Sequence, residues 1–331
     1  VLSTYAAVAL VASTAWATTT DPGDATQTAV GAGALLTSEG AATAWSELDT
    51  VELMRPSPFN APEDRPTVYT DPRGCTVGIQ ERAVRSCSYG QENAPRTLVI
   101  VGDSKILQWS DAIIDIAEES NWRVVIFSKS ACSFADAIRL ADGKLNPSCP
   151  WWSGQAVKQI IDLDPDLVVT SQRFSNAYPT GTTSLDGGYT RSAMVDGIVT
   201  RWTALANAGI PLIAVLDNPG PTDDVFECVA ESSAQLSDCS FEKAPAIAGS
   251  GAPAALEAAR RVNGTKVIDL GDVVCPEARR CAPVIRNVLV WRQTTHITNT
   301  YALSATPQLS DALAKATDGA LGNPMGSKGE N

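Results

Sequence analysis

Two residues of the chain have the side chains needed to activate a hydroxyl group for nucleophilic attack. Ser104 ends the segment R-T-L-V-I-V-G-D-S, where an apolar run gives way to a helical pattern. His296 is the only histidine and lies in W-R-Q-T-T-H-I-T near the end of the chain. A serine hydroxyl needs a base that works near neutral pH, and histidine does so without large tuning of its pKa. The order of nucleophile and then base is compatible with an α/β hydrolytic site.

Each of these residues also has an ordinary structural interpretation. Ser104 follows a strand pattern and opens a helix, as does a serine that only caps a helix. At such a turn the first free N–H groups of a helix favour developing negative charge, which also suits a nucleophile. A lone histidine is more often structural or exposed than catalytic. From these two residues alone, both the catalytic and the structural interpretation stay open. The choice depends on whether the predicted helices and strands bring the two residues together.

Short apolar runs alternate with helical patterns from residue 96 onward. The expected strands cover 97–101, 123–127, 167–170, 212–216 and 266–269, and the expected helices cover 105–119, 154–162, 192–208, 253–262 and 298–315. This alternation is typical of a parallel sheet covered by helices on both faces. It predicts an α/β fold with a central parallel sheet of about five strands. Ligands of such folds bind at the carboxyl ends of the strands, where Ser104 would lie.

The chain on either side of this region has a different composition. Residues 1–17 carry no charge and approach the length of a membrane span, so we expect the end of a transmembrane helix there; the alternative is an apolar helix of a soluble domain. Residues 18–95 are predicted to be a linker, rich in Thr, Gly and Ala up to residue 37, followed by a proline-rich extension that wraps the domain. The catalytic domain is expected over 96–317 and a disordered tail over 318–331.

Charge and cysteine content narrow the class of protein. A net charge of −12 and a pI near 4.6 argue against nucleic acid or an anionic membrane surface as the main partner. No C-x-x-C spacing occurs, and one histidine leaves little for a zinc site, so we expect no metal ion. We also expect no cofactor. The eight cysteines instead predict four local disulfides in an oxidising compartment, although sequence alone leaves the pairing open. The expected pairs are Cys75 with Cys87, Cys132 with Cys149, Cys228 with Cys239, and Cys275 with Cys281.

Three blocks of the sequence carry a family resemblance. V-G-D-S at 101–104, S-K-S-A-C at 128–132 and the block around His296 resemble the SGNH (GDSL-like) hydrolase superfamily. Together with the late cysteine pair and the apolar start of the chain, they resemble more narrowly the extracytoplasmic SGNH domain fused behind a membrane acyltransferase-3 domain in bacterial envelope O-acyltransferases. The resemblance covers residues 97–313 and implies an SGNH-hydrolase-like three-layer α/β/α sandwich.

The resemblance assigns roles to the matching positions. It makes Ser104 the nucleophile, with its own backbone N–H in the oxyanion hole, and His296 the base. Ala131 stands where the family usually has a glycine N–H, and an alanine N–H donates equally well in the right backbone conformation. The third block, T-S-Q-R-F, offers Gln172 or Arg173 as a further donor, and the choice stays open. Each such donor typically contributes about 3 kcal/mol in the transition state.

Two positions depart from the family pattern. Lys105 follows the serine where relatives often have histidine, at a helical position that we expect to lie outside the chemistry. Gln293 replaces the aspartate expected three residues before His296, and its oxygen can still accept the Nδ1–H. We therefore expect a Ser–His dyad oriented by Gln293 or by a backbone carbonyl. Asp217 is a weaker candidate for the missing acid, and we favour its interpretation as a strand-end turn cap.

The resemblance implies an O-acyltransferase on the extracytoplasmic face of the cell membrane. An upstream membrane domain of the same polypeptide would supply an acyl group, expected to be acetyl, and Ser104 would pass it to a hydroxyl of a cell-envelope glycan or glycolipid. The Ala/Thr/Asp-rich composition and the Q-T-T-H-I-T block resemble actinobacterial proteins, which suggests trehalose monomycolate as one acceptor. The alternatives are an esterase with the same chemistry and a non-catalytic envelope-binding module, the latter suggested by Gln293.

Overall fold

The computed structural model describes residues 30–37, 45–51, 53–323 and 325. The predicted end of a transmembrane helix at 1–17 lies outside these residues. Within the described part of the chain, no helix combines the length and the apolar character needed to cross a bilayer.

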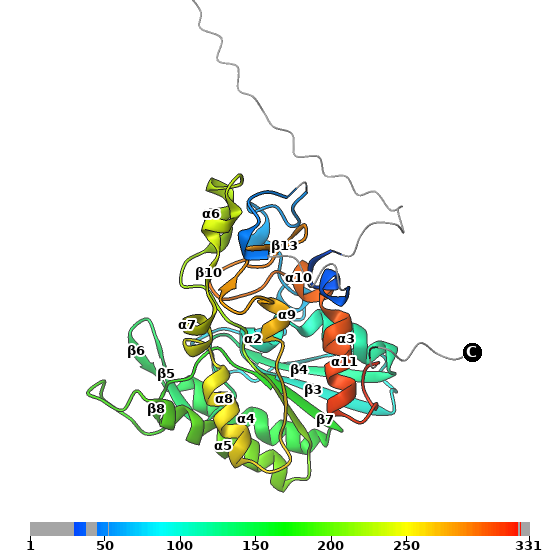
Figure 1. Ribbon diagram of the computed structural model, residues 1–331. Coiled ribbons are helices and arrows are strands. Elements are labelled where there is room, and N and C mark those ends of the chain that lie inside the picture. Colours follow the sequence, from blue (N-terminus) through cyan, green and yellow to red (C-terminus); the bar gives the residue numbers. More distant parts are fainter. Residues whose placement is uncertain (1–29, 38–44, 52, 324, 326–331) are drawn as a thin grey trace, which may run out of the picture.

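A sheet of seven strands forms the centre of the described domain (Figure 1). The five parallel strands predicted from the sequence are present and lie next to one another in the sheet, which confirms the α/β fold. Two short strands from the preceding extension enlarge the sheet at one edge, where one pairs parallel and the other antiparallel to the outer strand. In order, the strands are β1 (Thr76–Val77), β4 (Trp122–Lys129), β3 (Arg96–Gly102), β7 (Leu167–Ser171), β9 (Leu212–Val215) and β11 (Lys266–Ile268), with β2 (Ser86–Tyr89) beside β4.

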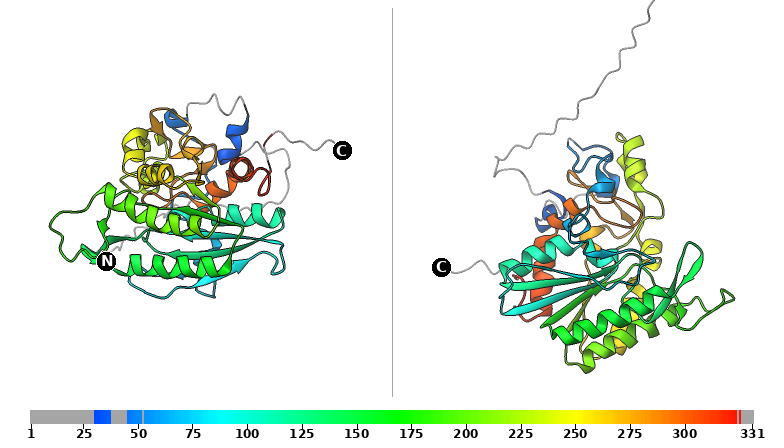
Figure 2. Two further views of the ribbon diagram at one scale, coloured as in Figure 1. Left: turned by 90° about the horizontal axis from the view of Figure 1, so that it is seen from below. Right: turned by 180° about the vertical axis from the view of Figure 1, so that it is seen from behind.

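Helices cover both faces of the sheet and complete the three layers (Figure 2). One face packs against α2 (Ser104–Leu107), α3 (Ser110–Glu119) and α11 (Thr306–Ala316), and the other against α4 (Ser148–Leu163), α5 (Arg191–Asn207) and α8 (Ala252–Arg261). Strand β3 shows why its apolar run is continuous: Leu98 and Ile100 belong to one core cluster and Val99 and Val101 to the other. Both faces of the strand are buried, as the pattern predicts.

Shorter elements surround this sandwich. They comprise α6 (Val225–Glu231), α7 (Lys243–Ala248), α9 (Gly271–Val274), α10 (Asn299–Ser304), the strands β5 (Ala137–Ala141), β6 (Lys144–Asn146) and β8 (Tyr178–Pro179), and the two-residue strands β10 (Phe241–Glu242), β12 (Arg280–Cys281), β13 (Val284–Ile285) and β14 (Val288–Leu289). Five 3₁₀ helices are described as well: η1 (Gly31–Leu36), η2 (Trp45–Glu47), η3 (Ala61–Glu63), η4 (Thr67–Tyr69) and η5 (Leu236–Cys239).

Two predicted helices are interrupted. The helix expected over 105–119 ends after one turn and restarts, giving α2 and α3. The helix expected over 298–315 is likewise divided into α10 and α11. Proline in the first turn of α11 has no N–H to continue the earlier helix, so a new helix begins there.

The packed domain is longer than predicted at both ends. Residues 31–36, expected to be part of a flexible linker, form η1, where Ala32 is fully buried and its N–H donates to Ser304 Oγ at 2.9 Å. Residues 318–323, expected to begin a disordered tail, also pack on the domain. Leu321 is fully buried, and Trp122 Nε1 donates to the carbonyl oxygen of Ala320 at 3.0 Å. The small residues of these two segments, which suggested flexible chain, pack against apolar neighbours of the domain instead.

Candidate functional site

Ser104 lies at the turn between β3 and α2, at the carboxyl edge of the sheet. Gly102 has φ +147°, and a Cβ there would come within 2.6 Å of the carbonyl oxygen of Ser171, so the close approach of β3 to β7 requires glycine. Asp103 is fully buried, and its two carboxylate oxygens accept from the N–H groups of Lys105 at 2.9 Å and Arg173 at 3.0 Å. Burial raises the pKa of Asp103 to about 6, and these two bonds oppose the rise. The aspartate therefore fixes the turn on which the half-buried Ser104 is presented.

His296 lies on a tight hairpin after β14. Trp291 and Ile297 form an antiparallel bridge, and the Arg292 N–H donates to the carbonyl oxygen of His296 at 3.0 Å. The His296 N–H closes the turn on the carbonyl oxygen of Gln293 at 2.9 Å. The hairpin thus presents the imidazole from a short, hydrogen-bonded segment.

The structure brings the two predicted residues into direct contact. His296 Nε2 lies 2.7 Å from Ser104 Oγ, and His296 Nδ1 lies 3.2 Å from the carbonyl oxygen of Gln293. A carbonyl oxygen only accepts, so Nδ1 carries the proton and Nε2 presents its lone pair to the serine hydroxyl. This is the tautomer that a general base needs. Of the two orienting groups left open by the sequence, it is the backbone carbonyl that contacts the imidazole, whereas the Gln293 side chain is exposed.

The surroundings of His296 disfavour its charged form. Burial lowers the pKa of the imidazole well below its ordinary value, and the positive charges of Lys105, Arg292 and Arg173 lower it further. The hydrogen bond to Gln293 acts in the opposite direction and is outweighed. The imidazole is therefore neutral at physiological pH and able to accept a proton.

Asp217 does not supply the missing acid. Its Oδ1 forms an ion pair with Lys105 Nζ at 2.9 Å, and its Oδ2 accepts from the Gly251 N–H at 3.0 Å. Asp217 is thus neither a partner of His296 nor a cap of its own turn, so the favoured interpretation as a turn cap is wrong. Burial raises the pKa of this carboxyl and lowers that of the Lys105 ammonium, while their ion pair opposes both shifts. Within the described ranges, no carboxylate is hydrogen-bonded to His296.

Ala131 occupies the turn that follows β4, beside the end of β3. Its φ is +54°, in the left-handed region that glycine adopts freely and alanine rarely. The residue therefore has a glycine-like conformation where the family usually has glycine. The register Gly102↔Ser128 places this turn at the same edge as Ser104.

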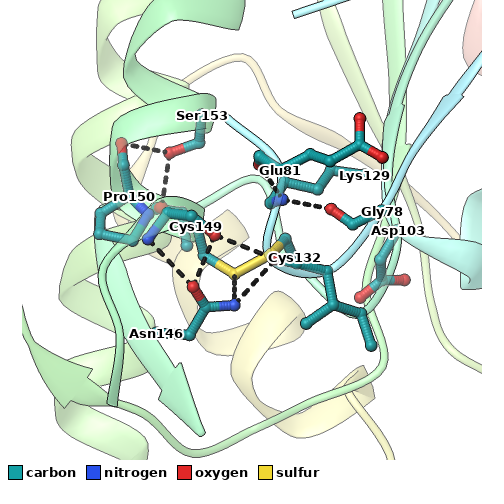
Figure 3. Close-up of a disulfide and its surroundings, with 12 residues drawn as sticks. Gly78, Glu81, Asp103, Lys129, Cys132, Asn146, Cys149, Pro150 and Ser153 are labelled. Atoms are coloured by element: carbon teal, nitrogen blue, oxygen red, sulfur yellow. Dashed lines mark hydrogen bonds between the residues drawn. A yellow bond between two sulfur atoms is a disulfide. The ribbon is translucent and has the colours of Figure 1, made fainter. Parts of the chain in front are cut away.

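Two anchors hold the turn of Ala131. The Cys132–Cys149 disulfide ties it to the start of α4, and Lys129, fully buried, donates to the carbonyl oxygens of Gly78 and Glu81. Figure 3 shows these groups, with Asp103 in the same neighbourhood. The predicted oxyanion segment is thereby fixed from two sides.

The two alternative donors of the third block have different environments. Gln172 is only 1% exposed, and Gly251 packs so closely against its carbonyl that a Cβ there would lie 1.8 Å from the oxygen. Arg173 is half-buried and lines a cavity, and its guanidinium donates to the carbonyl oxygen of Gly249 at 3.1 Å. Between the two, the structure places the Arg173 side chain where a ligand could meet it.

This cavity has a volume of about 570 Å³ and adjoins the hairpin of His296. Thr294 and Thr295, the two residues before the histidine, form part of its wall. The remaining wall is mixed polar and apolar: Arg173, Asp217, Gly220, Pro221, Thr222, Phe241, Glu242, Pro245, Ala246, Gly249 and Ser250. A ligand with several hydroxyl groups could find both hydrogen-bond partners and apolar contact there.

All four expected disulfides are formed: Cys75–Cys87, Cys132–Cys149, Cys228–Cys239 and Cys275–Cys281. Asp71 lies near the first pair, but sulfur atoms joined in a disulfide offer no thiolate to a metal ion.

The sequence matches a family described as "SGNH domain (fused to AT3 domains)" over residues 73–311. The chain belongs to this family. No curated protein matches it significantly.

Several solved structures resemble the fold. The periplasmic domain of a lipopolysaccharide acetyltransferase from Salmonella ser. Paratyphi A is 12% identical, with a TM-score of 0.48, over 69% of this chain and 85% of that domain. An acylhydrolase described as putative from Bacteroides fragilis is 13% identical, with a TM-score of 0.40, over 70% and 91%. A GDSL-like lipase from Bacteroides thetaiotaomicron is 12% identical, with a TM-score of 0.38, over 67% and 89%. At these identities and scores, none of the three assigns a role to a residue of this SGNH domain.

Proposed function

We propose that this SGNH domain is an extracytoplasmic O-acyltransferase that works through an acyl-enzyme on Ser104. The contact of 2.7 Å between Ser104 Oγ and His296 Nε2, with the imidazole in the tautomer of a base, carries the proposal. Membership of a family fused to AT3 domains supports an upstream membrane domain as the source of the acyl group. Four disulfides support a position outside the cytoplasm.

The reaction would proceed in two steps. Ser104 Oγ attacks the carbonyl carbon of the donor while His296 Nε2 takes its proton, and the proton then passes to the leaving group as the acyl-enzyme ester forms. In the second step His296 removes the proton of an acceptor hydroxyl as that hydroxyl attacks the ester carbonyl, and the imidazolium then returns the proton to Ser104 Oγ as the ester bond breaks. The N–H of Ala131 and the guanidinium of Arg173 would stabilise the oxyanion of both tetrahedral intermediates.

The proposed acceptor is a hydroxyl of an envelope glycan or glycolipid bound in the cavity beside the hairpin. Threonine and serine hydroxyls together with Arg173 and Glu242 offer donors and acceptors for sugar hydroxyls, and Phe241 offers an apolar surface. Trehalose is a suitable first probe, because trehalose monomycolate was suggested by the sequence and the free sugar is soluble.

Incubation with p-nitrophenyl acetate tests the proposal. The wild type should release p-nitrophenol and gain the mass of one acetyl group on Ser104, whereas Ser104→Ala and His296→Ala should do neither. Equal rates in wild type and Ser104→Ala would refute a catalytic role and favour an envelope-binding module. Adding trehalose then separates transfer from hydrolysis: acetyl-trehalose supports the transferase, and acetate alone indicates an esterase.

A further inference from the structure

A buried ammonium group joins the helix that begins at Ser104 to the hairpin that carries His296. Lys105 Nζ donates to the carbonyl oxygen of Thr295 at 2.5 Å and to Asn218 Oδ1 at 3.1 Å, besides its ion pair with Asp217. The Lys105 and Asp217 side chains are 0% and 1% exposed. The residue that was expected to lie outside the chemistry therefore contacts the residue directly before the histidine.

Gln108 makes a second connection at the end of the same helical turn. Its Nε2 donates to Asn218 Oδ1 at 2.5 Å, and its Oε1 accepts from the Ile297 N–H at 3.3 Å. Lys105 and Gln108 are three positions apart and so face the same side of the helix. Between them they hold the carbonyl before the histidine and the N–H after it.

These contacts matter because the imidazole itself has few restraints. Within the described part of the chain its hydrogen bonds go to Ser104 and to a backbone carbonyl of its own hairpin, and no carboxylate holds it. The contacts of Lys105 and Gln108 run from α2, whose first residue is Ser104, so they tie both members of the dyad to one helical turn. A relative displacement of about 1 Å is enough to slow such chemistry about a hundredfold.

We propose that Lys105 and Gln108 are positioning residues that hold His296 against Ser104 by fixing the backbone on either side of the histidine. The inference rests on the proposed acyl transfer by Ser104 and His296. It assigns to a buried cation and an amide the orienting task that a carboxylate performs in the family pattern.

The charges around His296 mean that replacing Lys105 should also change the pKa of the imidazole. Lys105 on α2, Arg173 after β7 and Arg292 on the hairpin face it with positive charge, and Asp217 after β9 compensates Lys105. Removing the ammonium alone should stabilise the imidazolium, because a cation is lost and the Asp217 carboxylate is left unpaired. Removing both charges of the pair should restore the charge balance without restoring the contact to Thr295.

Three variants separate charge from position. Lys105→Met removes the ammonium, and Lys105→Met with Asp217→Asn removes both charges while the new amide oxygen still accepts from the Gly251 N–H. Lys243→Met is the matched control, because Lys243 is also a buried lysine. Its ammonium pairs with Asp272 at 2.7 Å and donates to the carbonyl oxygen of Cys275 at 2.6 Å. Among the described residues it forms no hydrogen bond or ion pair with Ser104 or His296. The chain's single histidine makes NMR titration of the His296 ring unambiguous.

We expect Lys105→Met to raise the pKa of His296, and the acidic limb of kcat/KM for p-nitrophenyl acetate, by about one pH unit. The double variant should titrate like the wild type, yet both should lose about tenfold to a hundredfold in kcat with KM within about twofold. Lys243→Met should keep the wild-type titration even where it lowers Tm.

Folded variants with the kcat and histidine titration of the wild type would overturn the inference. So would a loss of Tm in the double variant with no loss of kcat, because the pair would then serve the fold alone. If Lys105→Met fails to fold, the charge-balanced double variant decides through kcat. A wild type that never acetylates Ser104 refutes the proposed function instead, and the NMR titration still reports whether Lys105 acts on His296.

Discussion

Substitutions of Gln293 can distinguish the role of its backbone carbonyl from the role of its side chain. The carbonyl oxygen accepts from both the imidazole at 3.2 Å and the His296 N–H at 2.9 Å, while the amide side chain is exposed. Gln293→Ala preserves both bonds. We therefore expect kcat to change by no more than about twofold, which corresponds to about 0.4 kcal/mol in activation free energy. As an exposed substitution it should alter the free energy of unfolding by less than about 0.5 kcal/mol.

Gln293→Asp restores the residue type of the family pattern and has a different expected result. A carboxylate about 6 Å from the imidazolium interacts by roughly 0.7 kcal/mol in water-like dielectric and roughly 3 kcal/mol at an effective dielectric of 20. Because residue 293 is exposed, the smaller value applies, and it raises the pKa of His296 by about half a unit. The acidic limb of kcat/KM should move to higher pH by the same amount.

The assay is the pH dependence of p-nitrophenyl acetate turnover, with Ser104→Ala as the blank and NMR titration of His296 as an independent reading. A loss of about tenfold or more in kcat for Gln293→Ala, with unchanged Tm, would refute the reasoning. It would mean that the side-chain amide, rather than the backbone carbonyl, holds the imidazole when the enzyme acts.

Three other predictions follow from the site. Ala131→Val should lose about 1–3 kcal/mol of stability and much of kcat, because it places a β-branched side chain in the left-handed region. Ala131→Gly should keep both the stability and kcat, and thermal unfolding together with turnover of p-nitrophenyl acetate measures the two effects. The wild-type acidic limb should lie below pH ~6.5, because burial lowers the pKa of His296 and the neutral base persists until the pH falls through that lowered value. Joint replacement of Cys132 and Cys149 by alanine opens a loop of sequence separation 17 and should cost about 3 kcal/mol, read as a lower Tm under non-reducing conditions.

The sequence predicted the parts of this molecule that depend on residue type. Alternating apolar and helical segments predicted the five parallel strands, because the inner strands of such a sheet must be apolar on both faces. Ser104 and His296 were identified because few side chains combine into a nucleophile and a base. The contact between them, across 192 positions, is a consequence of the fold.

The sequence left the group that orients the imidazole open between the Gln293 side chain and a backbone carbonyl. It did not predict the contacts of Lys105 and Gln108, because their partners on the hairpin are backbone atoms. The carbonyl oxygens of Gln293 and Thr295 and the N–H of Ile297 have no signature in residue type. Lys105 looked like an ordinary helical lysine, and only burial beside Asp217 distinguishes it. The position of a lysine directly after the nucleophilic serine was the one feature of the sequence that could have indicated its positioning role.

A base without a carboxylate has chemical consequences in the proposed mechanism. Nearby positive charge and burial make the imidazolium of His296 a stronger acid than that of an ordinary triad. Such a group is a poorer base toward Ser104, but it protonates a departing alcohol more readily, and the backbone contacts keep it in place for both steps. In a transfer between two hydroxyl groups, the leaving group and the acceptor have similar acidity, so each turnover needs both a proton acceptor and a proton donor. A neutral imidazole that returns its proton easily suits this exchange, and it explains why a rigidly held dyad could serve an acyltransferase without the acid of the family pattern.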